Sequence, residues 1–91
     1  MSRQRYTIEF SRKAERQFRG LSRQVQLRLS AKIESLGQNP RPRGAKKLEG
    51  VEKLYRISVG DYRVIYEVRD DVLVILVVKV GDRKEVYRRL G

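Results

Sequence analysis

Residues 54–66 constrain the fold more than any other part of this sequence. Apolar and polar residues alternate on both sides of Gly60-Asp61. This pattern predicts a β-hairpin with a two-residue turn, because glycine supplies the positive φ that a tight hairpin turn needs. Ser58 then lies opposite Arg63, and successive side chains alternate between the two faces. One face is apolar and predicts core: Tyr55, Ile57, Val59, Tyr62, Val64 and Tyr66. The other face consists of Arg56, Ser58, Arg63 and Ile65. It therefore holds two arginines close together, on the side away from the core.

The charge balance indicates an anionic partner. The chain of 91 residues holds 22 Lys and Arg against 11 Asp and Glu, a formal charge of +11. A charge this large in a short chain destabilises the compact state through self-repulsion, so a binding role explains it better than solubility alone. Nucleic acid is the leading candidate, and an acidic protein segment is the second. A membrane surface ranks third, because no segment has the wide apolar face of an interfacial helix.

Length and missing residue types narrow the function classes further. Residues 1–91 fit one domain with a modest core. There is no Cys and no His, which excludes disulfides, thiol chemistry and the commonest metal ligand. The absence of Cys makes a reducing cytosol the simplest location. We also find neither a membrane-spanning apolar run nor a signal-peptide core.

The first half of the chain predicts a strand and two helices. Residues 6–10 alternate and are rich in strand formers. Ser11 and Ser22 stand at N-cap positions before two stretches with apolar residues at helical spacing. We therefore expect a strand followed by an antiparallel pair of helices joined near Gly20. The basic residues in these two stretches lie outside the apolar stripes, and the simplest interpretation is that they form a solvent-exposed helix face.

Residues 39–50 predict a basic loop. Both prolines of the chain are here, together with Arg41, Arg43, Lys46 and Lys47. Such a loop just before the hairpin suits phosphate binding. For any single residue in it, a role as a soluble linker is about equally well supported.

The second half completes an α+β fold. Asp70-Asp71 suggests a tight turn, and residues 72–80 are apolar on both faces, as in a central strand. Gly81-Asp82 is expected to end that strand, and the tail from Arg83 predicts a short helix. The element order β-αα-βββ-α predicts a four-stranded antiparallel sheet with the helix pair on its core face and a short C-terminal helix.

The charged residues favour metal-free chemistry on RNA. The acidic residues are scattered, so we expect no metal and no cofactor. Without a metal, RNA is cleaved when a 2′-OH attacks the adjacent phosphorus, which requires phosphate binding, charge stabilisation and proton transfer. Arg56 and Arg63 suit the first two tasks, and Tyr87 could move a proton if cations lower its pKa. Taken alone, the pattern supports exposed sheet arginines and a packing tyrosine at least as well.

Four segments resemble the RelE/ParE toxin superfamily: residues 47–50, residues 54–57, the run Gly-Asp-Tyr-Arg-Val-Ile-Tyr at 60–66, and Val-Gly-Asp-Arg-Lys-Glu-Val-Tyr at 80–87. The ending favours the RelE-type mRNA interferases of toxin–antitoxin pairs. The resemblance spans nearly the whole chain. It implies a toxin that enters the ribosomal A site, cuts mRNA without a metal and is held inactive by a cognate antitoxin.

The resemblance also implies roles for individual residues. Arg56 matches a basic residue of the second strand, and Arg63 matches an arginine that contacts phosphate. Arg83 matches a candidate acid or transition-state stabiliser, and Tyr87 a tyrosine that stacks on the base or transfers a proton. These four form the expected catalytic set. We expect the surrounding basic residues to bind RNA: Arg43, Lys46, Lys47 and Lys84.

Two positions depart from the family pattern and keep other functions open. Many RelE-type toxins have a second basic residue where this chain has Ser58, and many have His where it has Asp82. The general base is therefore unassigned, with Lys46, Lys47 or Lys84 as possible substitutes. One alternative is a ParE-type toxin, which poisons DNA gyrase through protein contacts. The other is a catalytically weakened module that binds only antitoxin or RNA.

Overall fold

The computed structural model describes residues 5–50 and 53–82. It contains two helices and five strands, which follow one another in this order: β1 (Thr7–Phe10), α1 (Arg12–Arg19), α2 (Arg23–Ser35), β2 (Lys46–Lys47), β3 (Leu54–Val59), β4 (Tyr62–Arg69) and β5 (Val74–Asp82). Both predicted N-caps are confirmed. The Ser11 hydroxyl accepts a hydrogen bond from the Ala14 amide at 3.1 Å, and the Ser22 hydroxyl accepts one from the Val25 amide at 3.3 Å. Neither described helix is long and apolar enough to cross a membrane.

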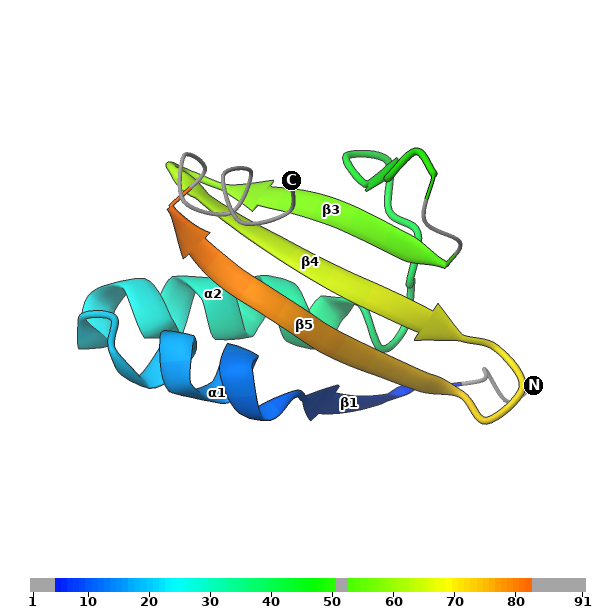
Figure 1. Ribbon diagram of the computed structural model, residues 1–91, viewed down its shortest axis with the longest axis horizontal. Coiled ribbons are helices and arrows are strands. Elements are labelled where there is room, and N and C mark those ends of the chain that lie inside the picture. Colours follow the sequence, from blue (N-terminus) through cyan, green and yellow to red (C-terminus); the bar gives the residue numbers. More distant parts are fainter. Residues whose placement is uncertain (1–4, 51–52, 83–91) are drawn as a thin grey trace.

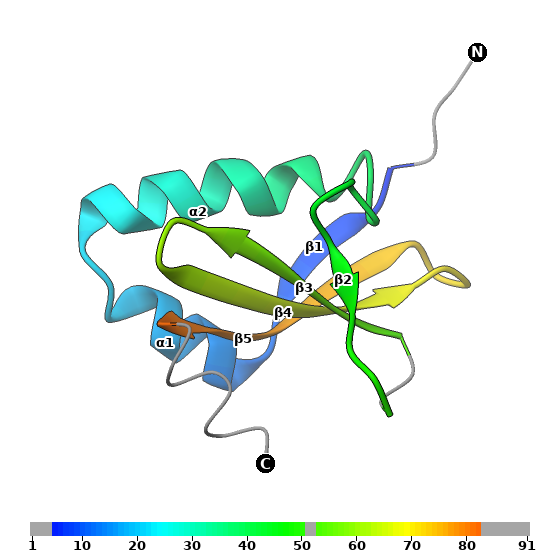
Figure 2. The same ribbon diagram turned by 90° about the horizontal axis from the view of Figure 1, so that it is seen from above.

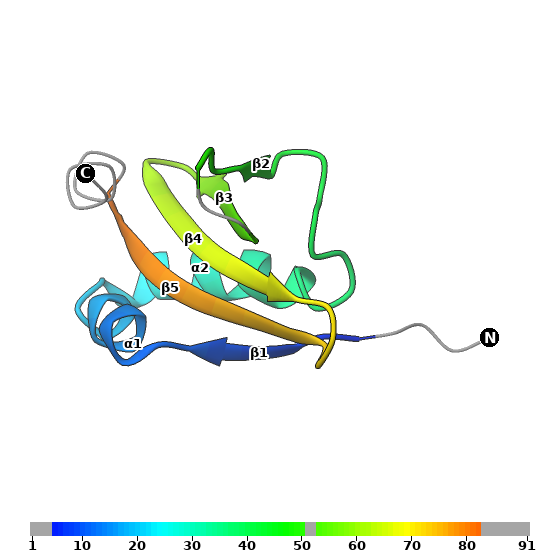
Figure 3. The same cartoon turned by 45° about the vertical axis from the view of Figure 1, so that its right-hand side comes forward.

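The sheet corrects the predicted four-stranded antiparallel arrangement. Five strands lie in the order β1-β5-β4-β3-β2, and β1 runs parallel to β5 while the other neighbours are antiparallel. Figure 3 shows β1 at one edge beside β5 and β2 at the opposite edge beside β3. Residue alternation is the same in parallel and antiparallel strands, so it could not give the direction of β1. The α+β class itself is confirmed.

Three element boundaries also differ from the prediction. Lys46–Lys47, which was expected to be loop, forms the short edge strand β2. The central strand starts at Val74 and continues through Asp82, so Gly81-Asp82 does not end it. The Asp70-Asp71 turn is present as the start of the connection from β4 to β5. The expected C-terminal helix lies outside the described residues.

The hairpin of β3 and β4 matches the predicted register. Ser58 pairs with Arg63 and Arg56 pairs with Ile65. Gly60 has φ 61°, the left-handed conformation that the turn requires. The inward face packs in one core with both helices, and β4 and β5 pass in front of α2 in Figure 1. The buried core consists of Ala14, Leu29, Ile33, Leu36, Ile57, Val64, Tyr66, Val68, Ile75, Val77 and Val80.

A β-bulge in β5 changes which side chains face outward. Ile65 pairs with Lys79, but the next residue of β4 pairs with Val77, so Val78 is the extra residue. Helix α1 binds the backbone around the bulge. The Ser11 hydroxyl donates to the Val78 carbonyl at 3.3 Å, and the Val80 amide donates to the Gln17 side-chain oxygen at 2.9 Å. These bonds give hydrogen-bond partners to the Val78 carbonyl and the Val80 amide, at the point where the bulge interrupts the regular pairing of the strands.

Candidate functional site

A row of basic residues crosses the outer face of the sheet. Lys46 of β2 pairs with Arg56 of β3, Arg56 pairs with Ile65 of β4, and Ile65 pairs with Lys79 of β5. Directly paired residues of neighbouring strands point to the same face. We call Lys46, Arg56 and Lys79 the basic row. It lies on the face opposite the helices and spans four strands.

Arg63 lies on the same outer face, diagonal to Arg56. Its cross-strand partners are Ser58 and Gly81, which are both small. One terminal nitrogen of the guanidinium donates to the Tyr62 carbonyl at 3.2 Å. The Nε atom is buried and has no hydrogen-bond partner within residues 5–50 and 53–82. A buried donor without a partner is unfavourable, and an anionic oxygen would satisfy it with a charge-assisted bond.

The surface beneath the basic side chains is apolar. Ile65 faces outward yet is fully buried, and Leu76, farther along the same face, is half-buried. Electrostatic attraction is stronger where water is excluded. An anion held by Arg56 and Arg63 above this floor would therefore be bound more tightly than on an open polar surface.

The other predicted site residues are not all brought together. Arg43, Lys46 and Lys47 are exposed. Lys46 joins the basic row, whereas Lys47 pairs with Tyr55 and so points to the opposite side of β2. Arg83, Lys84 and Tyr87 lie outside the described residues.

Lys79 was missed by the sequence reasoning. It is the only charged residue in the apolar run of residues 72–80, and that is the signal that could have drawn attention to it. Simple alternation from the buried Ile75 and Val77 would place Lys79 in the core. The bulge at Val78 reverses this and places it in the basic row.

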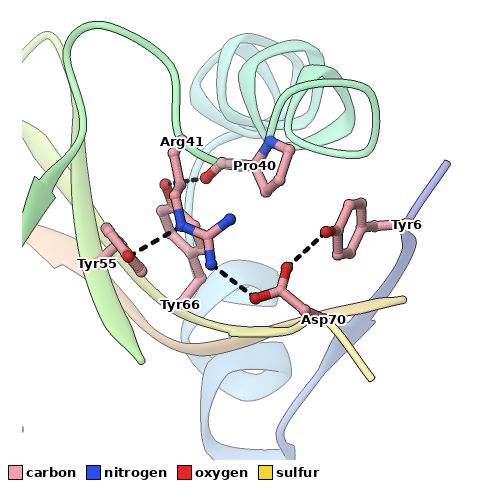
Figure 4. Close-up of polar contacts among 6 residues, drawn as sticks. All are labelled: Tyr6, Pro40, Arg41, Tyr55, Tyr66 and Asp70. Atoms are coloured by element: carbon pink, nitrogen blue, oxygen red, sulfur yellow. Dashed lines mark hydrogen bonds and ion pairs between the residues drawn. The ribbon is translucent and has the colours of Figure 1, made fainter. Parts of the chain in front are cut away.

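A second polar cluster lies on the helix-bearing side, at the end of the sheet where β4 turns into β5 (Figure 4). Arg41 donates from Nε to the Tyr55 hydroxyl at 2.9 Å and from Nη2 to Asp70 at 2.8 Å. The Tyr6 hydroxyl donates to the other oxygen of Asp70 at 2.6 Å. The Tyr66 hydroxyl donates to the Pro40 carbonyl at 2.7 Å. We call these six residues the loop anchor, since they tie residues 40 and 41 to strands β3 and β4 and to the turn after β4.

The electrostatics of the loop anchor follow from these bonds. The hydrogen bonds from Arg41 and Tyr6 lower the pKa of Asp70, while the bond to Asp70 raises the pKa of Tyr6. The bonds to Asp70 and Tyr55 raise the pKa of Arg41. Burial, followed by the nearby Tyr55, raises the pKa of Tyr66 to about 12. All four groups therefore keep their ordinary charge at neutral pH.

Within the described residues, no group of three or more His, Cys, Asp or Glu is arranged to hold a metal ion. Glu67, on the outer face, accepts a hydrogen bond from Arg69 Nε at 2.9 Å. Glu9 of β1 pairs with Leu76 and so lies on the same face. The region around Arg63 and the basic row is therefore cationic, and these two carboxylates lie beyond it.

Comparison with known proteins identifies the family. Residues 8–87 match the family model described as "ParE toxin of type II toxin-antitoxin system, parDE". The mRNA interferase toxin RelE of Escherichia coli is 34% identical over 86 residues, which cover 90% of each chain. The chain belongs to the RelE/ParE superfamily of type II toxins.

Solved structures of RelE proteins share the fold of this RelE/ParE toxin. A mutant of E. coli toxin RelE in the free state has a TM-score of 0.79 and 31% identity, with 92% of each chain covered. RelE in the archaeal RelE–RelB complex from Pyrococcus horikoshii has a TM-score of 0.75 and 31% identity, with 86% of this chain and 94% of that chain covered. The mixed sheet described above is thus the RelE fold.

Proposed function

We propose that this RelE/ParE toxin is an mRNA interferase, a metal-independent endoribonuclease that cuts mRNA in the ribosomal A site and so inhibits translation. The observation that carries the proposal is the buried, unpartnered Nε of Arg63 beside the basic row. The similarity to the mRNA interferase toxin RelE of E. coli supports it independently.

The proposed reaction needs no atom from a cofactor. The 2′-oxygen of a ribose attacks the adjacent phosphorus, and the bond from phosphorus to the 5′-oxygen breaks. The 2′-OH gives up its proton and the leaving 5′-oxygen takes one, so the products are a 2′,3′-cyclic phosphate and a 5′-OH. Arg63 binds the non-bridging oxygens, where negative charge develops in the transition state.

The remaining residues divide between binding and proton transfer. The basic row, Lys46, Arg56 and Lys79, holds the phosphates that flank the scissile one, and Arg43 and Lys84 add contacts along the strand. Lys47 points away from this face and has no part in the proposed site. Arg56 belongs to the catalytic set together with Arg63. Arg83 stabilises the leaving side, and Tyr87 stacks on a base or transfers a proton. These two assignments rest on the sequence motif at residues 80–87.

The proposed partners are the ribosome with its mRNA and a cognate antitoxin in the cytoplasm. Two solved complexes similar to this chain contain RelB: the intact E. coli RelBE toxin–antitoxin complex, at 30% identity, and the P. horikoshii RelE–RelB complex. An antitoxin for a toxin with a charge of +11 should carry an acidic segment.

The test measures mRNA cleavage on programmed ribosomes. Arg63→Ala should lower the cleavage rate by about a hundredfold or more, which is typical for loss of one transition-state donor. Arg63→Lys should recover only part of the rate, because a lysine has no guanidinium fork. Tyr87→Phe should also slow cleavage. Arg19→Ala, which removes an arginine from an exposed ion pair on α1, is the matched control and should cut normally.

Two results would overturn this proposal. Wild-type protein that leaves mRNA on ribosomes intact would rule out the interferase. Arg63 and Tyr87 variants that cut at the wild-type rate would rule out the catalytic assignment.

A gyrase-poisoning toxin is the second candidate. The matching family model is that of the ParE toxin, and Ser58 stands where many RelE-type toxins have a basic residue. A supercoiling assay with purified DNA gyrase separates the two candidates. An mRNA interferase leaves supercoiling unchanged, whereas inhibition by wild type and by Arg63→Ala alike would favour the ParE-type activity.

A further inference from the structure

The loop that carries the basic residues between α2 and β2 is stiff at one point. Arg41 stands between Pro40 and Pro42. Each proline fixes its own φ, and each restricts the preceding residue to extended backbone. The backbone of Arg41 is therefore held near one conformation before its side chain makes any contact. Fewer conformations are lost when the loop is fixed in place.

The Arg41 side chain connects this stiff point to the sheet. It binds the Tyr55 hydroxyl on β3 and Asp70 in the turn after β4, and its guanidinium lies 5.3 Å from the centre of the Tyr55 ring. Tyr66 binds the neighbouring Pro40 carbonyl and stacks on Tyr55 at 5.9 Å. The contacts of the loop anchor therefore come from two adjacent strands and a turn (Figure 4).

These contacts fix position more than they add stability. The Arg41 and Asp70 side chains are 44% and 57% exposed. Ion pairs this exposed add little stability, because water screens the two charges. Arg41 nevertheless bonds to two different elements at once through its planar guanidinium, which defines direction as well as distance.

Strand β2 depends on such an anchor for its place. It has only two residues and pairs with β3 alone at the edge of the sheet. A ladder this short is marginal by itself. The flanking bonds are the Ala45 amide to the Pro42 carbonyl at 2.9 Å and the Leu48 amide to the Leu54 carbonyl at 3.0 Å. The register of β2 decides whether Lys46 or Lys47 stands beside Arg56. Figure 2 shows β2 continuing directly from the anchored loop.

We propose that Arg41 is a positioning residue whose contacts with Tyr55 and Asp70 hold β2 in the register that places Lys46 beside Arg56. The RNA half of this inference rests on the proposed function. The structural half, the register of β2, does not.

The first experiment is a double-mutant cycle on RNA affinity. The probe is a short single-stranded RNA with 2′-O-methyl groups, which blocks attack by the 2′-oxygen. Lys46→Ala in the wild-type background should weaken binding by about two- to fivefold. In the Arg41→Ala background the same change should cost almost nothing, because Lys46 no longer has a fixed position.

Two outcomes of the cycle would overturn the proposal. One is an equal loss for Lys46→Ala in both backgrounds. The other is wild-type RNA affinity in Arg41→Lys. This variant keeps the positive charge but loses the planar guanidinium, so the charge of Arg41 alone would then explain its contribution to RNA binding. Arg19→Ala is the matched control for losing an arginine from an exposed ion pair.

The second experiment reads the structure without RNA. In hydrogen exchange, Arg41→Ala should speed exchange of the Leu48 amide by about tenfold or more while the β3–β4 hairpin keeps its protection. Unchanged exchange at Leu48 would overturn the anchoring role even if RNA binding falls. If wild type does not bind the probe at all, the proposed function fails, and exchange at Leu48 still decides the anchor.

Discussion

At the level of single side chains, the surroundings of Arg63 depend on how small its two cross-strand partners are. Ser58 on one side and Gly81 on the other place no large side chain directly opposite Arg63. Its Nε is buried without a partner among the described residues. Arg63 can therefore donate to a phosphate oxygen, and none of the ion pairs described above has to break first.

Ser58→Lys tests how much RNA affinity the protein lacks because the residue opposite Arg63 is uncharged. A cation directly opposite Arg63 should strengthen RNA binding by about two- to fivefold. Without RNA, repulsion between the new lysine and Arg63 should lower the free energy of unfolding by roughly 0.2–1 kcal/mol. RNA titration and urea denaturation measure the two effects, with Ser58→Gln as the uncharged control. Weaker RNA binding by Ser58→Lys at low salt would contradict the assignment of Arg63 to phosphate.

Asp70 makes the stability that the loop anchor contributes depend on pH. Its pKa is lowered from an ordinary 3.8 by the hydrogen bonds from Arg41 and Tyr6. Its contribution to stability is therefore complete above pH 3.8 and is lost as the pH falls through the lower folded value. Wild type should lose stability in this window, whereas Asp70→Asn should be less stable at neutral pH and show a flatter acid limb. Thermal unfolding between pH 2 and 7 measures this, and parallel curves for the two proteins would contradict it.

At the level of elements, the β3–β4 hairpin shows what local sequence determines well. Its register, its turn and the division of its faces all follow from alternation around Gly60. The direction of β1 and the pairing of β2 depend on residues far away in the sequence, so local patterns could not supply them. The position of Lys79 was missed for the same reason, because the bulge that turns it outward is bonded by α1 side chains.

The turn glycine makes this element testable. Gly60→Ala should destabilise the protein by about 1–2 kcal/mol, because φ is 61°. The added Cβ would also meet an Arg28 guanidinium nitrogen at 3.1 Å, although that side chain can move. Gly50→Ala has φ 76° and open space, so it isolates the backbone cost, and Gly44→Ala, with neither problem, is the control. Urea denaturation ranks the three variants. Equal stability of Gly60→Ala and Gly44→Ala would contradict the turn assignment.

At the level of the whole molecule, the charge of +11 is organised as well as large. Arg63 and the basic row gather four cations on the sheet face opposite the helices. The basic residues of α1 and α2 lie apart from these four cations, on the helices that cover the opposite face of the sheet. RNA bound along the sheet face should therefore respond to substitutions there and ignore isolated ones on the helices.

Salt dependence measures this organisation directly. The four cations of the sheet face, each contacting one phosphate of a single strand, together contribute roughly −3 to the slope of log affinity against log salt. Lys46→Ala should make the slope shallower by about 0.7, while Arg19→Ala should leave it unchanged. Titrations of the 2′-O-methyl RNA at several salt concentrations provide the slopes. A flat wild-type dependence would mean that these cations do not contact the RNA backbone.

The place of β5 between β1 and β4 has a consequence for synthesis. β5 follows every other described strand in the sequence, yet it is the only neighbour of β1 and one of the two neighbours of β4. While a ribosome is still making this chain, β1 has no partner, and Lys79 has not been added to the basic row. Domains with such distant pairings assemble only after the final strand emerges. A nascent chain in which β5 has not yet emerged therefore cannot form the sheet face that carries the basic row.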